Sequence, residues 1–235
     1  MHVEHVMGTA VRFDTGDSAD ERPLAEAIEW LHWVDQTFSV HRPDSQIMRL
    51  RTGAITETDV HSEVVGVLDR CMALRILTDG HFDHRPETSL DPSGYVKGWA
   101  VQRAMNILEA PGPARRCIDA GGDMVLRGDW NIGIKHPTEP ARAALVLGLN
   151  DQAIATSGNY ERGPHIWGDH LVDLHSVSVV GPDLGTADAL STAVYSSGDF
   201  EGDWLDRFPD YEVAVITREQ RILASPGIHR MVALA

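Results

Sequence analysis

Apolar residues recur with a helical period in the first half of the chain and in short strand-like runs in the second half. Apolar side chains spaced three or four residues apart predict a helix from Leu24 to Phe38, opened by Pro23. The same spacing predicts a second helix over residues 62–78, and a third helix that ends at Leu108. These segments would form the helical part of the fold.

Strand-like runs begin at the N-terminus and dominate after Arg116. Residues 2–13 predict a first strand that is interrupted by Gly8, where a bulge or a close ligand is expected. Further strands are predicted over residues 117–126, 130–135, 143–149, 152–156, 171–180 and 212–217, with a last strand after 220 and a short helix near 203–208. Strands in hairpin order with most helices in the first half predict a mixed α+β fold.

Length and composition describe an ordinary globular protein. The 235 residues, 43% hydrophobic and 23% charged, favour a single domain over residues 1–235, built as one unit or as two packed subdomains. The net charge of -15 argues against a nucleic acid or an anionic membrane as partner, but it suits a metal-dependent site. Cys71 and Cys117 follow no ligand spacing and form no disulfide framework.

Membrane and export features are missing from the chain as given. No signal sequence is present at its start, and no apolar run approaches the roughly 18 residues of a membrane-spanning helix. We therefore expect no transmembrane segment and a cytoplasmic protein.

The candidate chemistry concentrates after a strand that ends near Gly181. Asp188 and Thr192 are four residues apart, so they share one face of the helix predicted there. A carboxylate and a hydroxyl placed in this way can bind one hard cation, and a helix N-terminus attracts an anion such as a phosphate. The alternative is that Asp188 caps the helix and Thr192 bonds to its own backbone. The spacing alone leaves both interpretations open.

Two further helix starts carry polar groups. Gly94, Lys97 and Gly98 precede the helix that ends at Leu108, where they would form a phosphate cradle or simply an ordinary helix start. Asp44 or Ser45 is expected to cap a short helical turn that follows them.

Taken in order, the motifs of the chain resemble the ApbE family of flavin transferases, the FAD:protein FMN transferases. The resemblance covers most of the chain and depends on the order and spacing of the segments together. The matching segments are Met7-Gly8-Thr9, Phe38-Ser39 with Arg42-Pro43-Asp44-Ser45, Asp79-Gly80-His81-Phe82-Asp83, Leu90-Asp91 through Lys97-Gly98, Gly121-Gly122-Asp123, Ala155 through Tyr160, and Ala187 through Ala193.

The resemblance implies a fold of two packed subdomains with a mixed or antiparallel sheet and flanking helices. It also implies that FAD binds between the two halves with Mg²⁺ on its pyrophosphate. FMN would then move to a Thr or Ser hydroxyl of an acceptor protein that carries a flavinylation motif, and AMP would leave. Asp188 and Thr192 are the implied magnesium ligands, with the backbone carbonyl of Gly94 as a third ligand. Asp188 is also expected to be essential for catalysis.

The same resemblance implies a set of residues around FAD. Lys97 falls at the lysine beside the cofactor. The segments that line the flavin or the adenine end contain Met7, Gly8, Ser45, Asp119, Gly121, Gly122, Thr156 and Ser157. His165 matches a histidine that would act as the base for the incoming hydroxyl, and its alternative role is that of a surface loop residue.

Two segments depart from the family pattern. The link between Arg85 and Leu90 is much shorter than in the family, which indicates loss of a surface insertion. After His165 the chain continues Ile-Trp-Gly-Asp-His-Leu-Val-Asp173 instead of the usual Asp-Pro and Thr-Gly turn. Because this change falls on the acceptor side, an FAD pyrophosphatase that releases FMN and AMP, or a non-catalytic FAD-binding protein, remains an alternative to the transferase.

Overall fold

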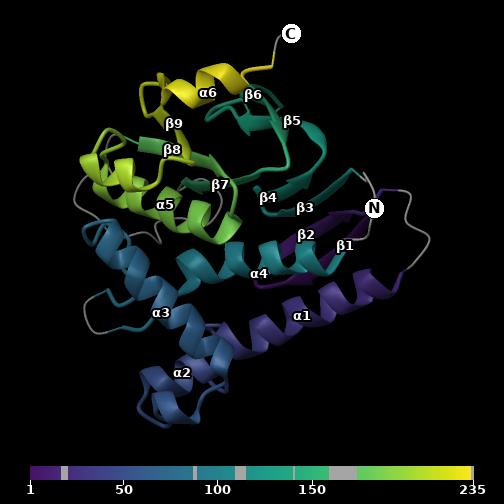
Figure 1. The fold of residues 1–235 in the computed structure, drawn as a ribbon, viewed down its shortest axis with the longest axis vertical. Coiled ribbons are helices and arrows are strands. Elements are labelled where there is room, and N and C mark those ends of the chain that lie inside the picture. The colour runs from purple at the N-terminus through teal and green to yellow at the C-terminus, as the bar shows by residue number, and fades with distance from the viewer. Residues whose placement is uncertain (17–20, 87–88, 109–114, 140, 159–173, 234–235) are drawn as a thin grey trace.

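The fold consists of a large antiparallel sheet covered by different layers on its two faces. The computed structural model describes residues 1–16, 21–86, 89–108, 115–139, 141–158 and 174–233. Helices α1, α3, α4 and α5 lie on one face of the sheet, and β5, β6 and α6 lie on the other (Figure 1). Each face has its own cluster of buried apolar side chains, so the sheet is the central layer of the molecule.

The helices differ in length according to their position. The long ones form the helical layer on one face of the sheet (Figure 1), and the short ones serve connections or the outer layer. Their bounds are α1 Arg22–Phe38, α2 Gln46–Arg51, α3 Ser62–Leu77, α4 Ser93–Leu108, α5 Leu184–Ser197 and α6 Pro226–Met231, with the 3₁₀ turns η1 Glu57–Asp59 and η2 Asp203–Arg207.

The large sheet has the strand order β1-β2-β3-β4-β7-β8-β9-β10, and a two-stranded sheet joins β5 to β6. Every pairing between the named strands is antiparallel. The bounds are β1 His2–Val6, β2 Thr9–Asp14, β3 Arg116–Ala120, β4 Asp123–Arg127, β5 Asp129–Lys135, β6 Ala143–Asn150, β7 Ala153–Gly158, β8 Leu174–Gly181, β9 Glu212–Thr217 and β10 Ile222–Ala224. The predicted α+β class, with antiparallel strands and flanking helices, is confirmed.

The prediction of one interrupted strand over residues 2–13 is wrong. The segment forms two strands, β1 and β2, that pair as a hairpin with Val6 opposite Thr9. Met7 and Gly8 make the two-residue turn with φ of 53° and 71°. Two successive residues with positive φ match the tight turn whose twist suits an antiparallel hairpin. Gly8 therefore reverses the chain instead of forming a bulge.

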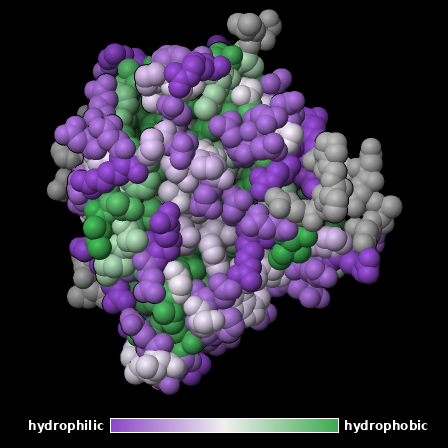
Figure 2. All heavy atoms as spheres, in the orientation of Figure 1, coloured by the Kyte–Doolittle hydropathy of each residue, from purple (hydrophilic) through white to green (hydrophobic). Residues whose placement is uncertain are grey.

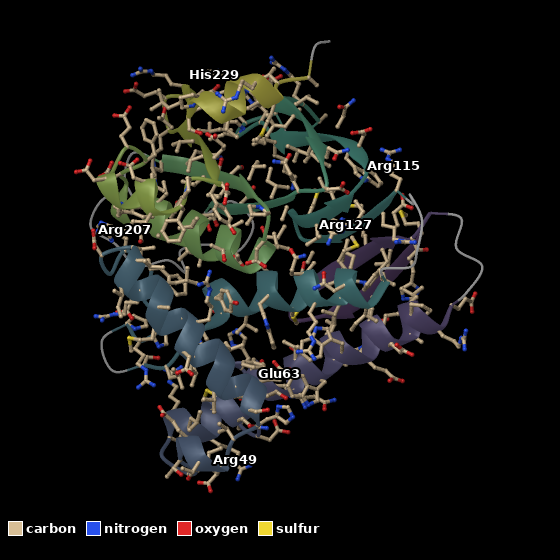
Figure 3. The ribbon with its side chains drawn as sticks, in the orientation of Figure 1. Arg49, Glu63, Arg115, Arg127, Arg207 and His229 are labelled. Carbon is tan, nitrogen blue, oxygen red and sulfur yellow. The ribbon has the colours of Figure 1, made fainter. Side chains whose placement is uncertain are left out.

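Ion pairs at the helix ends join the helical layer. Glu63, at the start of α3, lies where that helix approaches α1, and its carboxylate pairs with Arg103 of α4 (Figure 3). Near the other end of α3, Arg207 of η2 donates to Asp79 at 2.8 Å. These exposed pairs fix the helix ends in position, although each contributes little to stability.

The visible surface is mainly hydrophilic. Figure 2 shows separate small hydrophobic patches among polar side chains on this face, without a continuous apolar band. In the part of the chain that the structure describes, no helix combines the length and apolar character needed to cross a membrane.

Candidate active site

The site is built on the close contact between α4 and α5. A Cβ atom added to Gly98 would lie 2.4 Å from the carbonyl oxygen of Leu184, so only glycine allows this approach. The Gly98 N–H donates to Asp188 Oδ2 at 3.1 Å. Gly98, which the sequence associates with a phosphate cradle, thus brings α4 against α5 and fixes one oxygen of the Asp188 carboxylate.

The capping role proposed as an alternative for Asp188 is wrong. The helix α5 begins at Leu184, and Asp183 caps it by accepting a hydrogen bond from the Thr186 N–H at 2.8 Å. Asp188 lies within the helix and is only 4% exposed. A buried carboxylate inside a helix is costly unless it has polar partners or a cation, and the Gly98 N–H and the Lys97 ammonium are such partners for Asp188.

Gly94 of α4 lies close to the turn of α5 that carries Asp188 and Thr192. Thr192 follows Asp188 by one turn on α5, and the start of α4 lies against that turn, because a Cβ atom on Gly94 would lie 3.3 Å from Thr192 Oγ1. The structure therefore brings Asp188, Thr192 and the Gly94 backbone into one place, as the sequence predicts. A carboxylate, a hydroxyl and a carbonyl are the oxygen types that suit Mg²⁺.

This donor set contains a single carboxylate. Among the residues that the structure describes, no group of three or more His, Cys, Asp or Glu side chains is placed to hold a metal ion. A cation at Asp188 would therefore complete its coordination with water, and with phosphate oxygens when a substrate is bound, which is how Mg²⁺ is usually held. The residues present fit such a shared site, and the roles of Asp188, Thr192 and Gly94 as metal ligands stay predictions.

Lys97 lies between two buried carboxylates. Its ammonium group pairs with Asp123 Oδ2 and lies 3.9 Å from Asp188 Oδ1. Asp123 is 1% exposed, and its other oxygen, Oδ1, accepts the Thr156 N–H at 2.9 Å. Asp123 was not assigned a role by the sequence, although it follows the Gly121-Gly122 pair whose motif was recognised.

Hydroxyl groups connect the end of β7 to α5. Ser157 Oγ and Ser191 Oγ are 2.8 Å apart, and Ser191 donates to the carbonyl of Asp188 at 2.9 Å. Thr156 Oγ1 lies 2.8 Å from Ser178 Oγ on β8. The predicted cofactor segment around Thr156 and Ser157 is therefore tied to the same helix turn that carries Asp188.

A pocket of about 290 Å³ opens between the large sheet and β5. Its lining combines apolar side chains and several small residues with three charged side chains, as is typical of a small-molecule site. The lining residues are Thr9, Ala10, Arg12, Asp119, Gly121, Gly122, Met124, Ile132, Gly133, Ile134, Lys135, Ile154 and Thr156. Four of the predicted cofactor residues lie here, namely Asp119, Gly121, Gly122 and Thr156.

The rim of this pocket is formed by two hairpin turns. Gly121 has a φ of 68°, and a Cβ atom there would lie 2.7 Å from Thr9 Oγ1. The turn that contains Met7 and Gly8 therefore lies next to the turn of β3 and β4. Asp119 supports the second turn by accepting the Gly122 N–H at 2.8 Å, and its Oδ2 pairs with Arg12 at 3.1 Å.

Ser45 is not among the residues that line the pocket. It is fully buried, caps α2 by accepting the Met48 N–H at 3.0 Å, and donates to the carbonyl of Ser39 at 2.7 Å. These bonds confirm the predicted cap and use the hydroxyl for local structure. His165, together with the altered segment that follows it, lies outside the described residues.

The cysteines do not contribute a reactive thiolate. Cys71 is a core residue, and burial raises the pKa of its thiol to about 12. Burial likewise raises the pKa of Cys117 to about 12. Both thiols are buried and protonated at neutral pH, so neither is an activated nucleophile.

Comparison with known proteins identifies the family to which the sequence is similar. A model of the ApbE family matches residues 7–85 and 84–216. The FAD:protein FMN transferase of Klebsiella pneumoniae (strain 342) is 28% identical over 159 residues, which cover 61% of this chain and 50% of that protein. The FAD:protein FMN transferase of Treponema pallidum (strain Nichols) is 29% identical over 168 residues, which cover 59% of this chain and 46% of that protein. The chain thus spans about half the length of these curated relatives.

Solved structures show the same fold. The crystal structure of the apbe protein from Thermotoga maritima aligns with a TM-score of 0.83 and 20% identity over 99% of both chains. The flavin transferase ApbE from Vibrio cholerae aligns with a TM-score of 0.79 and 20% identity over 98% of both chains. The arrangement of sheet and helices is therefore shared along nearly the whole chain.

Proposed function

The chain belongs to the ApbE family, and from this membership we propose that it transfers FMN from FAD to a Thr or Ser hydroxyl of an acceptor protein, with Mg²⁺ as the cofactor and AMP as the leaving group. The observation that carries the proposal is the convergence of Asp188, Thr192 and Gly94 beside Lys97. This group of oxygens and one cation suits a magnesium ion together with a pyrophosphate. The names of the curated relatives support the same activity.

In this reaction the acceptor hydroxyl oxygen forms a bond to the phosphorus of the FMN half, and the bond from that phosphorus to the AMP oxygen breaks. Mg²⁺, when bound, supplies positive charge that neutralises the phosphate oxygens. Asp188, Thr192 and the Gly94 carbonyl would hold it. Lys97 adds a second positive charge on the same side, where negative charge shifts toward the departing AMP.

The pocket and its rim would bind the organic part of FAD. Apolar side chains such as Ile132 and Ile134 offer contact area to a flat ring, while Arg12 and Lys135 supply positive charge for an anionic ligand. Gly121 and Gly122 let backbone approach the ligand closely. We also propose that Met7, Gly8, Asp119, Thr156 and Ser157 contribute to this site, and cytoplasmic location stays a prediction of the sequence.

One incubation distinguishes the transferase from its two alternatives. We expect that FAD, Mg²⁺ and a peptide with an acceptor Thr yield a fluorescent flavinylated peptide and AMP in equal amounts. Release of free FMN with AMP, in place of labelled peptide, would identify an FAD pyrophosphatase. FAD that stays intact in a bound complex would identify a flavin-binding protein. The altered segment after His165 is the feature that favours these alternatives.

The proton of the acceptor hydroxyl needs a base, and we propose His165 for this role. Replacing His165 by Ala is expected to lower the rate of FMN transfer by about 100-fold, as is typical for loss of a general base. His229→Ala, at an exposed histidine of α6, serves as the control and should change the rate by less than about threefold, because surface substitutions have small effects. An unchanged rate for His165→Ala would remove this residue from the mechanism.

A further inference from the structure

Among the described residues, two carboxylates lie near the ammonium group of Lys97, and one of these two is a proposed metal ligand. The ammonium group pairs closely with Asp123 Oδ2, while Asp188 Oδ1 is 3.9 Å away. The two carboxylates come from different elements, because Asp123 begins β4 and Asp188 lies in α5. Lys97 thus has a preferred partner across the site from the oxygen donors.

Both carboxylates are fixed in place. Asp123 Oδ1 accepts the Thr156 N–H of the neighbouring strand at 2.9 Å, which extends the contact between β4 and β7 beyond their paired backbones. Asp188 Oδ2 accepts the Gly98 N–H at 3.1 Å. The side chain of Lys97 has several rotatable bonds and is 19% exposed, so the ammonium is the part of this cluster that can change partner.

A divalent cation and the ammonium of Lys97 would compete for Asp188 Oδ1. Two positive charges about 4 Å apart repel strongly where water is largely excluded. An ammonium that paired with Asp188 would therefore weaken metal binding, whereas an ammonium held by Asp123 leaves the Asp188 carboxylate with most of its attraction for a cation.

We propose that Asp123 is a positioning residue that holds Lys97 away from Asp188 and so preserves the affinity of the proposed metal site. This inference rests on the proposed function, because it assumes that Asp188 binds a divalent cation. Asp123 touches neither the metal nor FAD in this account and acts through Lys97. The Gly121-Gly122-Asp123 motif then has two roles. Its glycines border the pocket, and the Asp123 carboxylate sets the position of Lys97.

A double-mutant cycle on Mn²⁺ binding tests the inference without FAD or turnover. Free Mn²⁺ is measured by electron paramagnetic resonance for the unchanged protein, Asp123→Asn, Lys97→Met and the double variant. Asp123→Asn keeps an oxygen for the Thr156 N–H, and we expect it to weaken Mn²⁺ binding by about 10-fold or more, as for other residues that orient a metal site. Lys97→Met alone should change the affinity by less than about threefold, and the double variant should regain nearly the original affinity, which is the non-additive result.

The control variants distinguish a positioning role of Asp123 from a general effect of its negative charge. Asp119→Asn removes the same charge from the same hairpin, but its carboxylate pairs with Arg12, so Mn²⁺ affinity should stay within about twofold. If Lys97→Met raised the affinity equally in both backgrounds, the effects would be additive and the inference would be overturned. Recovery in the double variant would also show that Asn at position 123 is compatible with the folded site. If the unchanged protein bound no Mn²⁺, or if Asp188→Asn bound it normally, the metal proposal and this inference would both be overturned.

Discussion

Replacing Asp188 by Asn is expected to lower the rate of FAD turnover by about 1,000-fold or more, because it removes the only anionic ligand of the proposed magnesium site. Loss of a bound cation withdraws several kcal/mol of charge stabilisation from the transition state, and each 1.4 kcal/mol corresponds to about a factor of ten in rate. Thr192 and Gly94 offer neutral oxygens that cannot replace the charge. The rate is measured as FMN transferred from FAD at saturating Mg²⁺.

The isosteric change protects the fold. Asn at position 188 keeps a side-chain oxygen for the Gly98 N–H, so the contact between α4 and α5 should persist and the melting temperature should change little. Asp183→Asn is the matched control, because Asp183 caps the same helix and Asn caps equally well. Its turnover should remain within about threefold of the unchanged protein, since Asn preserves the cap and Asp183 is not a proposed metal ligand. Normal turnover by Asp188→Asn would show that the site has been assigned to the wrong residues.

The hydrophobic pattern predicted the long helices well. The expected helices over residues 24–38 and 62–78 correspond to Arg22–Phe38 and Ser62–Leu77. Each of these helices buries one stripe of apolar side chains in the core, and this burial leaves a period that can be counted in the sequence. The strand over residues 212–217 was likewise predicted with its observed bounds, because four successive buried residues follow Glu212.

Local backbone geometry was harder to predict. The hairpin of β1 and β2 depends on Met7, a non-glycine residue with a φ of 53°, and nothing in its side chain indicates this conformation. The short helix α6, from Pro226 to Met231, was not predicted because six residues contain too few turns to show a period. Glu212 on β9 accepts the Gly227 N–H at this helix, a contact between distant segments that sequence alone does not reveal.

The site was predictable where its residues share one element. Asp188 and Thr192 lie one turn apart on α5, so their spacing was enough to place them together. Asp123 was missed because its partner Lys97 lies on α4, and their ion pair exists only after that helix packs on β4. The capping role considered for Asp188 was wrong because the helix begins earlier than the apolar pattern suggested. Its cap is Asp183.

Gly98 shows that a residue can belong to a binding motif and still be required for another reason. The sequence associates it with phosphate binding, but the structure places it where α4 touches the backbone of α5. On the facing helix, a Cβ atom on Gly185 would lie 2.9 Å from the Tyr95 ring. Two glycines on facing helices therefore set the spacing between Lys97 and Asp188, and a change in that spacing would alter stability and the site together.

Gly98→Ala is therefore expected to lower the free energy of unfolding by about 3 kcal/mol, at the upper end of overpacking effects, because its Cβ atom would meet the Leu184 carbonyl at 2.4 Å. For a domain of this size the melting temperature should fall by about 6–12 °C. Gly66→Ala is the matched control, since Gly66 lies within α3 with no atom near its Cβ position, and there alanine should stabilise the helix by about 0.5–1 kcal/mol. A phosphate-binding role alone predicts the opposite for Gly98→Ala, namely unchanged thermal stability with weaker FAD binding. Thermal melts of the two variants without FAD decide between helix packing and ligand contact.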